Sequence, residues 1–174
     1  CQREAQIAKS VLNFVLIAAI AYGALVAVMY FAQPPLMYPG TAIAGDVPGK
    51  PPWGEIVKMS TPDGEQLFAL HSRAETGRPT ILFFHGNADR ITQYGFLAHG
   101  LANQGIGLLA VSYRGFTGST GSPTEEGLLI DGLTAHDWLA SQTDGPIVLL
   151  GQSLGSGVAV HLAAERPDVD GVIL

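Results

Sequence analysis

The stretch Ile147-Val148-Leu149-Leu150-Gly151-Gln152-Ser153-Leu154-Gly155 decides how this chain folds. Its first four residues are all apolar, which is typical of a strand in a parallel sheet that is covered on both faces. A serine between glycines follows at once, and an apolar segment of helical length, Ser156 to Arg166, then runs to Pro167. We therefore expect a strand, a tight turn at Ser153 and a helix in direct succession.

Further short apolar runs recur at helix-length intervals, at Ile81–Phe84, Gly107–Ser112 and Val169–Leu174. Ser122-Pro123-Thr124-Glu125 predicts the start of an intervening helix, with Ser122 as its cap and proline at the first helical position. Nearer the N-terminus, Glu55–Ser60 and Glu65–His71 flank the turn sequence Thr61-Pro62-Asp63-Gly64, which predicts an antiparallel hairpin. Together these patterns predict an α/β fold, in which helices flank a mostly parallel sheet with an antiparallel hairpin at its N-terminal end.

The N-terminal stretch is the most apolar part of the chain. No residue from Val11 to Ala32 is charged, and as a helix this stretch spans the roughly 30 Å hydrocarbon core of a membrane. We expect one transmembrane helix at 11–32 after a tail at 1–10, the alternatives being a cleaved signal peptide or a buried core helix. Arg3 and Lys9 precede the span, so the positive-inside rule places the rest of the chain outside the cytoplasm. Residues 33–52 are rich in proline and glycine and predict a linker without helix.

Gly151-Gln152-Ser153-Leu154-Gly155 has the G-x-S-x-G pattern of a nucleophile elbow. The serine backbone is strained on such a turn, and its neighbours must lack bulky side chains. Gly151 and Gly155 meet that requirement, so Ser153 is the candidate catalytic nucleophile. The alternative is a glycine-rich turn that binds an anion at a helix N-terminus. Its phosphate-loop form needs a lysine after the glycines, and residues 154–158 contain none.

A serine that attacks a carbonyl group creates an oxyanion, which backbone N–H groups must stabilise. The N–H of Leu154, at the start of the predicted helix, is one expected donor. The N–H of Asn87 is the other, in the loop His85-Gly86-Asn87-Ala88 after the first parallel strand, where Gly86 allows a sharp turn. We expect His85 to support this loop through a hydrogen bond to its backbone and to take no part in proton transfer.

Other polar residues have mainly structural interpretations. Tyr113 and Arg114 follow a strand end, and a network that ties loops together is favoured over contact with substrate. Four acidic residues are expected in solvated or capping positions: Asp131 and Asp137 on a helix face, and Asp168 and Asp170 before the last strand.

Four motifs in this order resemble those of the α/β-hydrolase superfamily: His85-Gly86-Asn87-Ala88, Ser112-Tyr113-Arg114-Gly115-Phe116, the segment Gly118–Gly127, and Gly151-Gln152-Ser153-Leu154-Gly155. More narrowly, they resemble its membrane-anchored branch of α/β-hydrolase-domain and serine aminopeptidase-like proteins. The resemblance implies that residues 53–174 form the N-terminal part of an α/β-hydrolase domain. Members of the superfamily hydrolyse acyl esters, acylglycerols, lipids or protein thioesters, so it also implies an acyl ester or thioester substrate, with lipids among the candidates.

In this fold the triad follows the order serine, acid, histidine, so both partners of Ser153 are expected beyond Leu174. None of the five histidines suits the role of the catalytic base. His71 and His85 precede the serine in early strand and loop positions, and His99 and His136 fall in predicted helices. His161 lies about two helical turns beyond Ser153, too far along the helix to meet its hydroxyl. We therefore expect a truncated hydrolase fold, and no hydrolase activity from residues 1–174 alone.

For the complete protein we expect a single-pass membrane serine hydrolase that works through an acyl-Ser153 intermediate. A non-catalytic anchored scaffold with the same fold and an acyltransferase using the same serine are the alternatives. A net charge of −6 without a basic cluster argues against nucleic acid as a partner. With Cys1 as the only cysteine and no metal-ligand pattern, we expect no metal site and no cofactor.

Overall fold

The computed structural model describes residues 2–42, 45, 47 and 49–174. The chain forms two compact units, Cys1–Met37 and Tyr38–Leu174. The first unit is a single helix and the second is a layered α/β domain, and each is described here by itself.

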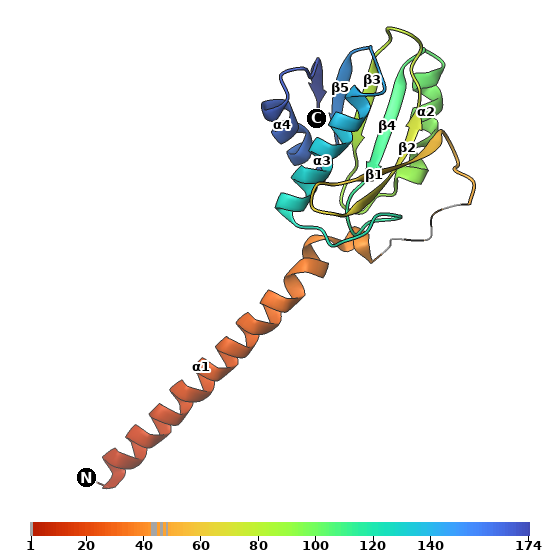
Figure 1. Ribbon diagram of the computed structural model, residues 1–174. Coiled ribbons are helices and arrows are strands. Elements are labelled where there is room, and N and C mark those ends of the chain that lie inside the picture. The colour runs from red at the N-terminus through yellow and green to blue at the C-terminus, as the bar shows by residue number, and fades with distance from the viewer. Residues whose placement is uncertain (1, 43–44, 46, 48) are drawn as a thin grey trace. The chain divides into compact units, whose positions relative to one another are not determined.

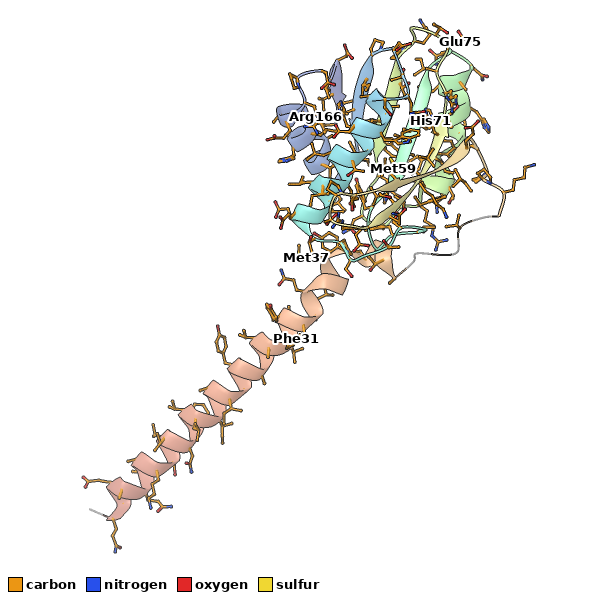
Figure 2. All side chains as sticks on the ribbon, in the orientation of Figure 1. Phe31, Met37, Met59, His71, Glu75 and Arg166 are labelled. Carbon is orange, nitrogen blue, oxygen red and sulfur yellow. The ribbon has the colours of Figure 1, made fainter. Side chains whose placement is uncertain are left out.

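Helix α1 spans Gln2–Met37 and carries no charged residue from Val11 to Ala32. Figure 2 shows side chains standing out all around it, and the labelled Phe31 is 77% exposed. From Gln2 to Gln33 the helix is long and apolar enough to cross a membrane, with a mean hydropathy of 2.4 in its most apolar window. The predicted apolar helix at 11–32 is thus present, and by length and composition it could span a bilayer.

The helix continues past Ala32 to Met37, so the predicted linker at 33–52 does not begin at Gln33. Positions 34 and 35 are prolines within its last turn, where a φ fixed near −65° suits helical geometry although each proline lacks a donor. A short 3₁₀ helix, η1 at Pro39–Thr41, follows directly. Residues 43, 44, 46 and 48 of the predicted linker lie outside the described residues.

A sheet of six strands organises the second unit, in the order β1-β2-β4-β3-β5-β6. The strands are β1 Glu55–Ser60, β2 Gln66–Ser72, β3 Thr80–Phe84, β4 Gly107–Ser112, β5 Ile147–Gly151 and β6 Gly171–Ile173. The pairs β1–β2 and β2–β4 are antiparallel, whereas β4–β3, β3–β5 and β5–β6 are parallel. The predicted α/β fold with an antiparallel N-terminal hairpin is therefore confirmed.

Helices cover both faces of the sheet (Figure 1). The short helix η2 at Ile91–Tyr94 and α2 at Gly95–Ala102 lie on one face, and α3 at Glu125–Ala140 and α4 at Leu154–Glu165 lie on the other. Because side chains alternate along a strand, β3 contributes to two cores. Leu82 and Phe84 pack with α3 and α4, while Ile81 and Phe83 pack with η2 and α2.

Helix α3 begins later than the sequence predicted. Its cap is Thr124, not Ser122, and its first residue is Glu125. Thr124 is extended, and its hydroxyl accepts a hydrogen bond of 3.0 Å from the Gly127 N–H. This bond satisfies one of the free donors of the first turn, which is the physical role of a cap.

Candidate active site

Ser153 lies on the turn that joins β5 to α4. Its φ is +50° and its ψ is −113°, and it is the one non-glycine residue with positive φ among the described residues. An L residue adopts this conformation at a cost of about 1–3 kcal/mol, which the surrounding structure must impose. The strained serine predicted from the G-x-S-x-G pattern is therefore present in the backbone.

The two glycines of the pattern allow close approaches of the main chain. A Cβ atom at Gly155 would lie 2.0 Å from the carbonyl oxygen of Phe84, at the end of β3. A Cβ atom at Gly151 would lie 2.7 Å from the carbonyl oxygen of Gly155. Any side chain at either position would push α4 away from the sheet, and the turn around Ser153 would open.

The N-terminus of α4 points its first N–H groups toward this turn. Gly155 donates to the Gln152 carbonyl at 2.9 Å and Ser156 to the Ser153 carbonyl at 2.9 Å. The N–H of Leu154, the first residue of the helix, has no acceptor among the hydrogen bonds of the described residues. A free donor at the positive end of a helix favours negative charge beside Ser153.

The loop after β3 lies next to the serine. A Cβ atom at Gly86 would be 3.7 Å from the Cβ of Ser153. Gly86 donates its N–H to the Asp89 carboxylate at 3.2 Å, and Asp89 donates its own N–H to the Gly86 carbonyl at 3.2 Å. These two bonds close the loop on itself beside the serine.

His85 is fully buried beneath this loop, and its Nδ1 lies 2.7 Å from the Gly86 carbonyl oxygen. A carbonyl can only accept, so Nδ1 carries a proton. Burial lowers the pKa of His85, which favours the neutral form of the ring. The hydrogen bond to loop backbone expected of His85 is thus present.

The same hydrogen bond constrains the N–H of Asn87. The Gly86 carbonyl and the Asn87 N–H belong to one planar trans peptide, so they point in opposite directions. With the carbonyl held by His85 on the buried side, the N–H of Asn87 is directed away from the core. The role of the Asn87 N–H as an oxyanion donor stays a prediction.

Sequence reasoning missed a second connection between loop and elbow. Tyr94, from η2, donates its hydroxyl proton to the side-chain Oε1 of Gln152 at 2.8 Å. Burial, and then the nearby carboxylate of Asp89, raise the pKa of Tyr94. The variable residue of the G-x-S-x-G pattern is therefore tied to the segment after β3, which no local pattern indicates.

Asp131 does not lie on a solvated helix face as predicted, because it is fully buried. It accepts hydrogen bonds from the Arg114 main-chain N–H at 2.8 Å and from Arg114 Nε at 2.9 Å. Arg114 also pairs with Asp63 of the β1–β2 turn at 2.6 Å. Arg114 thus joins the turn, the end of β4 and α3, which is the loop network favoured for it.

The other acidic residues have partners at the surface or in loops. Asp137 is exposed, as expected, and pairs with Arg166 at 2.9 Å. Asp170 accepts a 2.8 Å hydrogen bond from the Ile147 N–H, as a capping residue does. Asp168 is exposed, with an oxygen 3.6 Å from Nε2 of the buried His136. These groups all lie at the end of β5 opposite to Ser153.

A shallow groove of about 360 Å³ lies beside Ser153. Its wall is mainly apolar and comes from the ends of β3 and β5, from η2 and α2, and from the chain end: Phe83, Tyr94, Leu97, Leu150, Gln152 and Leu174. Among the described residues, no histidine is hydrogen-bonded to Ser153, and no cluster of His, Cys, Asp or Glu could hold a metal.

The sheet order, the helix layers and the strained serine turn define the N-terminal half of an α/β-hydrolase. A family model described as serine aminopeptidase, S33, matches residues 75–174, which is more than half of the chain. The chain therefore belongs to this hydrolase family.

Relatives and solved structures agree with this assignment. The chain is 33% identical over 153 residues to Protein bem46 of Schizosaccharomyces pombe, covering 80% of this chain and 51% of that protein. It is 37% identical over 106 residues to Lysophosphatidylserine lipase ABHD12 of Xenopus tropicalis, covering 57% of this chain and 26% of that protein. Esterase Pf2001 of Pyrococcus furiosus shares the fold, with a TM-score of 0.60 and 20% identity over 74% of this chain and 53% of that chain. The chain thus spans about half the length, or less, of these relatives.

Proposed function

We propose that the complete protein is a membrane-anchored serine hydrolase that cleaves acyl esters or thioesters through an acyl-Ser153 intermediate. The positive φ of Ser153 at the β5–α4 turn is the observation that carries this proposal. Backbone strain at a polar residue persists where surrounding contacts enforce it, and such residues cluster at catalytic sites. A structural turn could use glycine here at no cost.

In the proposed reaction, Ser153 Oγ attacks the acyl carbonyl carbon while a base accepts the hydroxyl proton. The carbonyl oxygen gains negative charge and accepts hydrogen bonds from the N–H groups of Asn87 and Leu154. Collapse of the tetrahedral intermediate expels the alcohol or thiol, which takes the proton from the base. Water then hydrolyses the acyl-serine by the same steps.

The base and its carboxylate partner are proposed to come from the part of the complete protein that follows Leu174. His85 is unsuited to the role, because its Nδ1 is bound to Gly86 and its ring is buried. Family order also places the acid and the histidine after the serine. Among substrate classes, acylated lipids are supported by a relative named as a lysophosphatidylserine lipase.

The anchoring part of the proposal rests on α1. Its Gln2–Gln33 span is long and apolar enough to cross a bilayer. Arg3 and Lys9 lie at its N-terminal end, so the positive-inside rule favours a domain on the non-cytoplasmic side.

Active-site labelling of the complete protein tests the proposal. A fluorophosphonate probe should label Ser153, as mapped by peptide mass spectrometry, and Ser153→Ala should abolish both labelling and hydrolysis of p-nitrophenyl butyrate. Ser141→Ala, at an exposed residue that follows α3 and lies outside the proposed chemistry, serves as the control and should keep both. Labelling that persists in Ser153→Ala would place the nucleophile elsewhere, and a folded wild-type protein without label would favour the non-catalytic scaffold.

A further inference from the structure

The residues that follow α1 in sequence are part of the catalytic domain's core. We call Tyr38–Thr41 the post-helix segment. Tyr38 is only 8% exposed and belongs to the same buried cluster as Tyr113 and Phe116. Burial, and then the charge of Glu125, raise the pKa of the Tyr38 hydroxyl. A passive linker would leave such a ring in water.

Gly40 of this segment is packed against the oxyanion loop. A Cβ atom at Gly40 would lie 2.0 Å from the Asn87 carbonyl oxygen and 2.3 Å from Cε1 of Phe116. Real Cβ atoms essentially never come this close to a backbone oxygen. The main chain of Gly40 thus fills the space directly beside Asn87, and only glycine fits there without displacing the loop.

The post-helix segment completes a set of contacts on three successive carbonyls of that loop. The His85 carbonyl accepts a hydrogen bond of 3.2 Å from the Tyr113 hydroxyl, and the Gly86 carbonyl is bound by His85 Nδ1. The Asn87 carbonyl is the one against which Gly40 packs. These contacts restrain the peptide planes on both sides of the Asn87 Cα: the Gly86–Asn87 peptide, which carries the Asn87 N–H, and the adjoining Asn87–Ala88 peptide.

Aromatic rings connect the segment to the same loop from below. The rings of Phe116 and His85 are 5.3 Å apart, and those of Tyr113 and His85 are 4.6 Å apart. Phe116 therefore packs between the His85 ring, which is hydrogen-bonded to the loop, and the main chain of Gly40.

We propose that the post-helix segment is a positioning element of the oxyanion hole, in which Gly40 holds the Asn87 carbonyl, in the peptide next to the one that carries the Asn87 N–H donor. The inference rests on the proposed serine hydrolase function and adds a role for residues next to the anchor. Activity should then require residues 38–41 of the complete protein but not the apolar helix before them.

The first test compares Gly40→Ala with Gly49→Ala in the complete protein. A Cβ atom at Gly49 meets nothing within 4 Å, so that variant controls for adding a methyl group nearby. Gly40→Ala should lower kcat for p-nitrophenyl butyrate roughly 10- to 100-fold with little change in KM, because displacing a catalytic group by about 1 Å costs up to roughly 100-fold. The inhibition constant of a trifluoromethyl ketone, which forms an oxyanion on the serine, should rise by the same factor.

The second test uses two truncations, in case Gly40→Ala does not fold. A protein that starts at Tyr38 should keep the kcat of the complete protein, whereas one that starts at Ala42 should lose roughly 10- to 100-fold in kcat. Equal kcat and equal inhibitor affinity in the two truncations would overturn the inference. So would a Gly40→Ala protein that is less stable but binds the ketone as tightly as the wild type. If the wild-type protein shows no hydrolysis that depends on Ser153, the proposed function itself is refuted.

Discussion

Replacing Ser153 by glycine should give a more stable protein than replacing it by alanine, although both changes remove the hydroxyl. Ser153 has φ +50° and ψ −113°, which glycine adopts freely and which an L side chain adopts under strain. Such strain amounts to about 1–3 kcal/mol, and alanine retains it because it retains the Cβ atom. The Ser153 side chain makes no capping hydrogen bond to α4, so neither variant loses one. We expect the glycine variant to be more stable than the alanine variant by about 1–3 kcal/mol.

Ser141 provides the matched control, since it is the residue after α3 and has φ −77° and ψ −11°. In this ordinary helical conformation glycine should be less stable than alanine by about 0.5–1 kcal/mol, so the sign should reverse between the two positions. Urea unfolding of the complete protein, followed by the fluorescence of Trp53 and Trp138, measures both differences, provided that the m-value stays constant.

A Ser153→Ala protein as stable as the Ser153→Gly protein would show that the turn stores no strain. The geometric support for a nucleophile elbow would then be lost, whatever the activity of the wild type. A preference for glycine at Ser141 of the same size would point to a general effect of glycine and not to the turn.

Three further outcomes are expected of the complete protein. Asp131→Asn should destabilise it by about 3–5 kcal/mol in urea unfolding, because the buried Arg114 loses the fully buried one of its two charged partners, whereas the exposed Asp144→Asn should change stability little. The hydrogen bonds from Arg114 and Thr61 lower the pKa of Asp63 from 3.8 to about 2, so its stabilising contribution is present above pH 3.8 and is lost as the pH falls toward 2. Acid unfolding curves of the wild type and Asp63→Asn should therefore converge at the low end of that interval, and parallel curves would contradict it. Removal of residues 2–37 should move the protein from the carbonate-washed membrane fraction to the soluble fraction, and a truncated protein that stays with membranes would show a second attachment.

Local sequence patterns predicted the order and type of the main elements because they depend on short-range physics. Continuous apolar runs placed β3, β4 and β5 nearly to the residue, since a strand buried on both faces has no polar side. The N-cap of α3 was predicted less well. Because Pro123 suits the first helical position, the sequence predicted Ser122 as the cap, whereas Thr124 makes the capping hydrogen bond. Two acceptable caps two residues apart cannot be ranked without the contacts that surround them.

The burial of Asp131 could have been predicted from the helical spacing of its apolar neighbours. Leu128 and Ala135, three residues before it and four after it, are both buried, so the acidic residue lies on the apolar face of α3. Its partner Arg114, however, could not be identified from spacing, because the pair spans 17 residues and joins a strand end to a helix.

What the sequence by itself determined is local: an apolar helix at the N-terminus, a parallel α/β sheet, and a serine between glycines where strand meets helix. Each follows from neighbours within a few residues, through backbone sterics, hydrophobic period and the missing Cβ of glycine. What only the tertiary structure decided is which distant groups meet around that serine. Tyr94 reaches Gln152, and Gly40, expected in a linker, packs on Asn87. The free energy gained by burying apolar surface depends on the area buried and not on how far apart the residues are in the sequence. These contacts therefore cannot be predicted from local sequence patterns.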